Sequence, residues 1–440
     1  MQMIAGERIY ELAASIFPIC RSITGKGVRD TLKILGNYIG NDCGIELSVH
    51  EVPTGTKVFD WVVPKEWVIR EAYIADESGK HIADMAEHNL HILGYSGPVD
   101  RWVELKELKE YIFTQPQQPD VIPYVTSYYK ERYGFCLSEN QKNTLCEGKY
   151  HMHIDSELIN GSLTYGEVIV PGKSDNEIFF STYICHPSMA NDECSGPSLV
   201  AELVRYVASL PERRYTYRFV YVPETIGAIT YLATKGHLEY MKEHMLAGFN
   251  LSCVGDDRDY SIVESRYADT LADKVLKNVL GNRGTYSNYS FLQRGSDERQ
   301  YNAPGVELPV VCFCRSKFGV YPEYHTSADD LKLISPAGFQ GSFDVMTEVI
   351  QALEHNACYK MTVCCEPQLG KRGLYPTLSQ KNSYDKVKTM MNFIAYADGK
   401  MDLVDISDTI HVPINELIPL VDKLTEAGLL EACEGMREHI

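Results

Sequence analysis

The chain has 440 residues, of which 44% are hydrophobic and 10% aromatic, and its formal net charge is -18. At roughly 100–200 residues per domain this length predicts several folded units, and the composition excludes an intrinsically disordered chain. A strongly negative field repels phosphate backbones and anionic lipid surfaces, so we expect neither nucleic acid nor a membrane as a partner.

The cysteines and the first residues indicate the compartment. There are 13 cysteines, an odd number, and none is spaced as Cys-x-x-Cys. Scattered thiols in a chain of this size are typical of a reducing cytosol. The opening residues 1–8 lack a basic region followed by an apolar one, so we expect no signal peptide. We therefore predict a cytoplasmic protein.

The first 150 residues change from helical to strand-like patterns. Apolar spacing predicts two helices between residues 7 and 39, with a break at Arg21–Gly25. From residue 45 to 95, short alternating segments predict β-strands separated by turns. The segment 115–123 is a loop by its proline and glutamine content, and a tyrosine-rich segment follows it.

After residue 150, strands and helices alternate along the chain. Continuous apolar runs are typical of strands that are covered on both faces. Strands that alternate with helices predict an α/β fold with a mixed, largely parallel open sheet flanked by helices. The predicted strands are 167–170, 177–184, 217–222, 248–254 and 308–313, and the main helices are 196–210 and 338–355.

These patterns divide the chain into three parts. Residues 1–55 and 150–355 form the α/β domain, residues 56–149 form a β-rich domain inserted into it, and residues 363–440 form a C-terminal winged helix. From Asp402 onward, two basic residues stand against nine acidic ones. That charge has the wrong sign for DNA phosphates. We expect this winged helix to contact a protein partner or a second copy of the chain.

Polar residues follow the predicted strands at the points where the strands end. His186 comes directly after the strand 177–184, Asp192 follows before a helix, and Glu224 and His325 follow later strands. Sites in open α/β sheets form beyond the carboxyl ends of the strands, and zinc binds imidazole and carboxylate groups. Each residue alone also has a structural explanation: a hydrogen-bonded strand end, a helix cap or a surface loop.

From about residue 150 to 350 the chain resembles the co-catalytic zinc aminopeptidase superfamily, which includes bacterial leucyl-type aminopeptidases and glutaminyl cyclases. The resemblance matches His186, His325 and Asp192, the last in Asn-Asp-Glu-Cys-Ser-Gly, to metal ligands. It matches Glu224 to the general base. In Tyr-His-Thr-x-x-Asp, it implies that Asp329 is the outer partner that orients His325.

Two positions depart from that superfamily. It has a second glutamate ligand where this chain has Thr225, and a second aspartate ligand where this chain has Ser252. Each of two metals would therefore lose one carboxylate. The remaining His-Asp-His set implies a single zinc ion per chain.

The whole chain also resembles a narrower group of bacterial proteins that are named for polysaccharide biosynthesis. These proteins combine an aminopeptidase-like domain, an inserted domain of unknown function and a C-terminal winged helix. The resemblance rests on the segments Ile122–Tyr129, Ile184–Ser188, Pro223–Gly227, Gly295–Arg299 and Tyr324–Thr326.

Within this set, Asp297 and Arg299 are candidates for binding the two ends of a zwitterionic or acidic substrate. The alternative is an ordinary charged loop with an internal salt bridge. Tyr128 and Tyr129 are candidates for the wall of the cleft, with a plain core position as the alternative.

We expect a zinc-dependent, aminopeptidase-like hydrolase that cleaves an amide or peptide bond near a free amino group. Its substrate would be a peptide or an amide-containing small molecule, with Glu224 as the base. One alternative is a zinc amide- or acyl-transfer enzyme that acts on glycan precursors in polysaccharide biosynthesis. The other is a non-catalytic metal-binding regulatory protein, which the two missing carboxylates favour.

Overall fold

The computed structural model describes residues 3–128, 130–374 and 381–433. These residues divide into two compact units. The first unit contains residues 1–266 and 287–343, and the second contains residues 267–286 and 344–440. Among the described residues, no helix combines the length and apolar character needed to cross a membrane.

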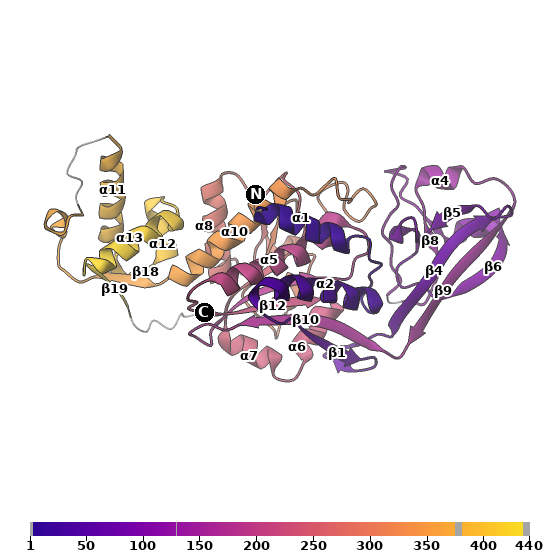
Figure 1. Ribbon diagram of the computed structural model, residues 1–440, viewed down its shortest axis with the longest axis horizontal. Helices are drawn as coiled ribbons and strands as arrows, with labels where there is room; N and C mark the ends of the chain where they lie inside the picture. Colours follow the sequence, from indigo (N-terminus) through magenta and orange to yellow (C-terminus); the bar gives the residue numbers. More distant parts are fainter. Residues whose placement is uncertain (1–2, 129, 375–380, 434–440) are drawn as a thin grey trace. The chain divides into compact units, whose positions relative to one another are not determined.

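An eight-stranded sheet forms the centre of the first unit (Figure 1). The four middle strands run parallel to one another, and the strands on either side of them are antiparallel to their inner neighbours. The predicted mixed, largely parallel sheet is therefore confirmed. In spatial order its strands are β1 (Ser48–Pro53), β10 (Ser162–Val170), β12 (Thr216–Val222), β11 (Glu177–Tyr183), β13 (Met245–Leu251), β16 (Val310–Cys314), β14 (Ser261–Val263) and β15 (Ser287–Tyr289).

Helices cover both faces of this sheet (Figure 1). On one face lie α1 (Ala5–Ile16), α2 (Lys26–Cys43) and α5 (Ser195–Ser209), which contact one another. Helix α1 buries Ile9, Leu12, Ala13 and Ile16, the spacing that gives a helix one apolar side. The other face carries α6 (Ile226–Ala233), α7 (His237–His244) and the short α9 (Glu298–Tyr301). The closing helix is α10 (Pro336–His355), whose range runs from the first unit into the second.

A second, antiparallel sheet follows α2 in the sequence and belongs to the same unit. Its strands are β5 (His81–Asp84), β4 (Glu66–Asp76), β9 (Lys149–Ile159) and β6 (Val99–Glu104). Smaller elements around it are β2 (Lys57–Val58), β3 (Trp61–Val62), α3 (Leu105–Leu108), β7 (Ile112–Phe113), β8 (Phe135–Cys136) and α4 (Glu139–Asn143). β9 begins at residue 149, the predicted end of the inserted domain, but it pairs with β4 and β6, so the inserted sheet continues to Ile159.

The two faces of this second sheet differ because side chains alternate along a strand. Ala72 and Ile74 on β4 and Met152 and Ile154 on β9 are buried, and they belong to one apolar cluster that continues to Phe179 of the large sheet. The residues between them point to the opposite face, where polar and aromatic side chains meet solvent. The two sheets therefore share a core, and one face of the second sheet stays open.

The second unit contains the C-terminal helices. The sheet order is β18 (Asp398–Asp402), β17 (Cys358–Met361) and β19 (Leu430–Ala432). The helices are α8 (Leu271–Arg283), α11 (Lys381–Tyr396), α12 (Leu403–Ile410) and α13 (Ile414–Glu426). Lys274 on α8 pairs with Asp405 on α12 at 3.1 Å. In sequence order, helix α8 lies between β14 and β15, and the apolar pattern of the sequence did not predict this helix.

Candidate metal centre and pocket

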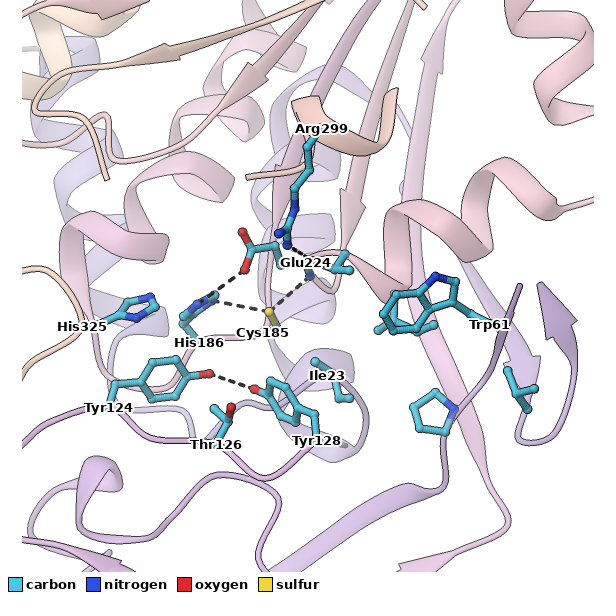
Figure 2. A pocket seen from close by; sticks show the side chains of 14 residues that line it. Ile23, Trp61, Tyr124, Thr126, Tyr128, Cys185, His186, Glu224, Arg299 and His325 are labelled. Atoms are coloured by element: carbon cyan, nitrogen blue, oxygen red, sulfur yellow. Dashed lines mark hydrogen bonds and ion pairs between the residues drawn. The ribbon is translucent and has the colours of Figure 1, made fainter. Parts of the chain in front are cut away.

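Two parallel strands bring His186 and Glu224 together. β11 pairs with β12 so that Tyr183 lies opposite Val222, and each functional residue follows shortly after the end of its strand. The two side chains point toward one another, with 3.9 Å between His186 Nε2 and Glu224 Oε2 (Figure 2). This is the rim beyond the carboxyl ends of the strands, where sites of open α/β sheets form.

Asp192 lies in a short irregular turn, Ala190–Cys194, immediately before α5. The buried carboxylate of Asp329 accepts hydrogen bonds from the backbone nitrogens of Ala190 (3.0 Å), Asn191 (2.6 Å) and Asp192 (3.0 Å), and from the Tyr321 hydroxyl (2.9 Å). Burial and the Asp192 carboxylate raise the pKa of Asp329 to about 7. The oxygens of Asp329 therefore hold the turn that carries Asp192, and its predicted role behind His325 stays a prediction.

The close approach of this turn to the sheet requires a glycine. A Cβ atom on Gly196, at the start of α5, would collide with Thr182 on β11 and with the carbonyl oxygen of Leu251 on β13. Gly196 therefore lets the first turn of α5, and Asp192 before it, lie directly against the strand ends.

His325 is held by a loop of the inserted region. Its backbone carbonyl accepts a hydrogen bond from the Tyr124 nitrogen at 2.8 Å, and its φ of 57° is in the left-handed region. Tyr324 stacks on the His325 ring with 3.9 Å between centroids, and Tyr124 meets the ring edge-on at 5.1 Å. The position of this imidazole thus depends on residues about 200 positions away in the sequence, a dependence that strand-end spacing does not reveal.

The three side chains assigned as metal ligands from the sequence converge. One donor atom from each of His186, Asp192 and His325 lies within 4.8 Å of the other two. Asp192 Oδ2 and His325 Nε2 are 3.1 Å apart, the spacing of an ion pair when the imidazole is protonated, and neither buried atom has another hydrogen-bond partner among the described residues. When the imidazole is neutral and its Nε2 carries a lone pair, the two atoms need a cation between them, so this set fits a zinc ion.

Only one oxygen of Asp192 is available to a metal. The other, Oδ1, accepts a hydrogen bond from the Tyr183 hydroxyl, which also lies 2.7 Å from Ser252 Oγ. Ser252 stands where the superfamily resemblance implies an aspartate ligand. The Tyr183–Ser252 pair therefore occupies the side of Asp192 that a second metal would use, and this geometry fits one ion better than two.

His186 is oriented by groups behind it. Its Nδ1 lies 3.4 Å from Glu193 Oε2, which also accepts hydrogen bonds from the backbone nitrogens of Cys185 and of His186 itself (2.8 Å for the latter). Glu193 Oε1 accepts a hydrogen bond from the buried Arg21 at 2.9 Å. A carboxylate on one ring nitrogen leaves the other for a metal. Sequence reasoning missed Arg21 and Glu193, although Glu193 directly follows Asp192.

A strained turn carries Glu224. Thr225 has φ 65° and ψ -77°, and the nitrogen of Ile226 donates to the carbonyl of Glu224 at 2.8 Å, so these residues form the rare γ-turn of positive φ. Asp297 Oδ1 accepts from the Thr225 nitrogen at 2.7 Å, and Arg299 donates to the Thr225 hydroxyl. Strain of this kind persists where surrounding contacts enforce it, which is common at functional sites.

Burial makes the carboxyl groups of this site harder to ionise. It raises the pKa of Glu224 to about 7, against the opposing attraction of His186. It also raises the pKa of Asp297 well above its ordinary value, and the Glu224 carboxylate adds to that rise. Glu224 is 23% exposed, and this exposed part faces the cavity described next.

A cavity of about 320 Å³ opens beside these residues (Figure 2). His186, Glu224 and His325 line one side of it, and Arg299 also reaches it. Aromatic residues form much of the remaining wall: Trp61, Tyr124 and Tyr128. The cavity is therefore lined by the two histidines of the ligand set, by the Arg299 guanidinium and by several aromatic side chains.

Two predicted substrate contacts, Arg299 and Tyr128, thus lie at the cavity. The third, Asp297, does not line it; this residue is fully buried and supports the Thr225 turn. Tyr129 lies outside the described residues. The sequence did not single out Trp61 as a wall residue, because it comes from the β2–β3 hairpin, far from the strand ends in the sequence.

Comparisons with known proteins identify the family to which this chain belongs. Residues 10–356 match the family model described as Domain of unknown function (DUF4910), and residues 357–432 match a winged helix-turn-helix. A protein of Clostridium acetobutylicum, named for polysaccharide biosynthesis and an aminopeptidase-like domain, is 41% identical over 429 residues, which cover 97% of this chain and 96% of that protein.

Solved structures agree with the family match. A crystal structure from Clostridium acetobutylicum, whose name proposes a peptidase, has a TM-score of 0.90 at 40% identity and covers 97% of this chain and 96% of that one. A zinc aminopeptidase from Bacillus subtilis has a TM-score of 0.59 at 12% identity, covering 79% of this chain and 94% of that one. The latter likeness establishes the fold alone. The resemblance drawn from the sequence motifs is confirmed for family and fold.

Proposed function

The chain belongs to the DUF4910 family with a C-terminal winged helix, and we propose that it is a zinc-dependent hydrolase of amide or peptide bonds near a free amino group. One observation carries the proposal. Asp192 Oδ2 and His325 Nε2 are buried, face one another at 3.1 Å beside a cavity and have no other hydrogen-bond partner among the described residues. A metal cation can bind both atoms at once, because each atom has a lone pair to donate.

Each residue has a role that follows from its contacts. We assign His186, Asp192 and His325 as the ligands of one zinc ion, which when bound would polarise a carbonyl group and lower the pKa of its water. Glu224 is the group best placed to take and return a proton, since its carboxylate lies 3.9 Å from His186 Nε2 and faces the cavity. Glu193 and Asp329 hold the ligands in place.

The cavity wall suggests the kind of substrate. Arg299 is the cationic side chain at the cavity, and its guanidinium suits a carboxylate or another acidic group. Trp61, Tyr124 and Tyr128 suit an apolar or planar portion. We therefore favour a small amide with an acidic group and an apolar or ring-shaped part, within the wider class of peptides and amide-containing small molecules.

The test is turnover of the zinc-loaded full-length chain on a panel of aminoacyl amides, acidic dipeptides and N-acyl sugars. Glu224→Gln keeps the side-chain shape and removes the base, so it should lower kcat on any true substrate by about a hundred- to ten-thousand-fold while zinc stays bound. Glu239→Gln, an exposed carboxylate on α7, is the matched control and should leave kcat unchanged.

Two outcomes would contradict this mechanism. Equal turnover by the wild type and Glu224→Gln would place the base elsewhere. Loss of zinc from Glu224→Gln would make Glu224 a fourth ligand, which closes the open coordination position and favours a non-catalytic metal-binding regulatory protein.

A second candidate function is an amide- or acyl-transfer reaction on glycan precursors. The name of the Clostridium acetobutylicum relative favours it, because that name refers to polysaccharide biosynthesis. The same panel separates the two functions. Cleavage of N-acyl sugars, or acyl transfer to a sugar amine, without cleavage of aminoacyl amides would support the transfer enzyme.

A further inference from the structure

The open face of the inserted sheet carries a second group of metal-type donors. Asp100 on β6 and His151 and His153 on β9 place one donor atom each within 4.8 Å of the others. These residues have no part in the rim site described above, whose proposed ligands come from the segment after β11, the turn before α5 and the His325 loop. Neither the family match nor any relative's name refers to this group.

Strand register explains why these three side chains meet. β6 and β9 are antiparallel, and Asp100 pairs directly with His153 while Trp102 pairs with His151. Residues 151 and 153 are two apart on one strand, so their side chains share a face. On the other side of β9, Tyr73 of β4 pairs with His153. Three strands thus converge on one patch.

The distances suit a small cation. His151 Nε2 lies 2.6 Å and His153 Nδ1 lies 3.5 Å from Asp100 Oδ1. Two ligands of a tetrahedral zinc ion are about 3.4 Å apart, given metal–ligand bonds of about 2.0–2.1 Å. The Asp100 side chain is 70% exposed and free to make the small adjustment that this spacing needs. His153 Nδ1 is buried and makes no hydrogen bond among the described residues.

Aromatic stacking holds both imidazoles in place. Trp102 stacks on His151 with 5.1 Å between centroids and an interplanar angle of 11°. Tyr73 stacks on His153 at 4.9 Å. Glu71 Oε2 lies 3.9 Å from Nε2 of His153, on the ring edge away from Asp100. This distance is too long for a hydrogen bond, so Glu71 would support the ring as an outer partner only after a small side-chain movement.

We propose that this face binds a divalent transition-metal ion of the zinc, cobalt or nickel class through His151, His153 and Asp100. Two imidazoles select such ions over magnesium or calcium, which prefer oxygen ligands. Three protein ligands on an open surface leave coordination positions for water or for a donor group of another molecule. The ion exchanges with solvent, in contrast with the ion of the buried rim site.

The experiment uses the full-length chain with the rim ligands removed, as His186→Ala/His325→Ala, so that binding elsewhere stands out. Titration with Co²⁺, followed by its visible absorption and by calorimetry, should give one bound ion per chain. Adding His153→Ala or His151→Ala should weaken this binding at least about tenfold, the effect that loss of even an outer partner of a ligand commonly has.

The matched control is His81→Ala on the same sheet. His81 stacks on Tyr73 and pairs with Asp84 at 2.6 Å, outside the three-residue donor set, so its loss should leave Co²⁺ affinity close to that of the parent. Absence of Co²⁺ binding in a folded rim-deleted variant would overturn the proposal. Equal affinity after loss of His151 and His153 would overturn it as well.

A second measurement covers the case in which the rim-deleted variant does not fold. Wild-type protein that retains its rim zinc should take up one further equivalent of Zn²⁺ in equilibrium dialysis, and His153→Ala should not. Equal uptake by the two proteins would overturn the proposal. Because His153→Ala leaves the rim ligands intact, failure here is distinguishable from failure of the proposed hydrolase function.

Discussion

The rim of the large sheet and the open face of the inserted sheet carry the same donor types, two histidines and one aspartate, in opposite surroundings. At the rim, Asp192 is fully buried and His186 is 4% exposed. On the inserted sheet, the Asp100 side chain is 70% exposed and Trp102 is 52% exposed. Burial strengthens electrostatic interactions and makes an unpaired polar atom costly, so a partner matters more to the rim donors, although His153 Nδ1 on the inserted sheet is also buried.

The groups that hold the proposed ligands in place also differ between the two regions. Behind the rim donors lie a buried ion pair, Arg21 with Glu193, and the four hydrogen bonds of Asp329. The donors on the inserted sheet rely on cross-strand register and ring stacking. A cavity that Glu224 also lines adjoins the rim donors. If both proposals hold, the same ligand types serve chemistry at the rim and reversible binding on the inserted sheet, according to what surrounds them.

The largest expected effect is the loss of zinc when a proposed rim ligand is removed. We expect about one zinc ion per purified chain. His186→Ala and His325→Ala should each lose most of this zinc, because the remaining shell is a poor zinc site. The fold should survive, since the rim lies at the edge of a large apolar core. Elemental analysis after gel filtration measures this. Full zinc occupancy in either variant, or two tightly held ions in the wild type, would show that the ligand set is incomplete.

A smaller effect tests the support behind His186. Glu193→Gln removes the carboxylate on His186 Nδ1 and should weaken zinc binding about 10–100-fold, measured by competition with a chelating dye. It also leaves Arg21 buried without its charge partner, at a cost of about 3–5 kcal/mol in the free energy of unfolding.

The control for Glu193→Gln is Glu177→Gln, at the other end of β11. Glu177 is equally buried and pairs with Arg218 at 2.7 Å, so its loss should also destabilise the chain, although Arg218 keeps Glu167 as a second partner. Zinc affinity should not change, because Glu177 is remote from the ligands. Equal losses of affinity in both variants would mean that stability, not ligand orientation, explains the result.

The smallest expected effect concerns the cavity. Arg299→Lys keeps the charge but loses the planar guanidinium, so KM for an acidic substrate should rise roughly tenfold, about 1.4 kcal/mol of binding, with little change in kcat or zinc content. Steady-state kinetics on the best substrate of the panel measures it. Arg294→Lys, at an exposed arginine shortly before α9, should leave KM unchanged. A fall in kcat alone would assign Arg299 to the Thr225 turn.

Local sequence patterns were sufficient for much of the rim. His186 and Glu224 directly follow apolar strands, and parallel strands end at a common edge, so their proximity follows from chain order and sheet type. The fold class follows in the same way from alternating apolar segments. The order of β14 and β15 at the sheet edge could not be predicted, because both strands have only three residues and little periodicity.

Long-range packing decided the remaining features. Asp329 was expected behind His325, which stays a prediction, and the tertiary structure shows that its carboxylate holds the backbone that carries Asp192. Asp297 was expected at the substrate, but it is buried beneath the Thr225 turn. Hydrogen-bond partners such as these depend on side-chain direction, which residue spacing does not specify.

The three donor residues on the inserted sheet show most clearly what residue spacing does not specify. The sequence by itself determined that His151 and His153 share one face, because side chains alternate along a strand. It did not determine that Asp100, about fifty residues earlier, lies opposite His153, because strand pairing is set by register. A shift of one residue would turn Asp100 to the buried face and separate the three donors. Only the tertiary structure, through the pairing of β6 with β9, decided that they meet.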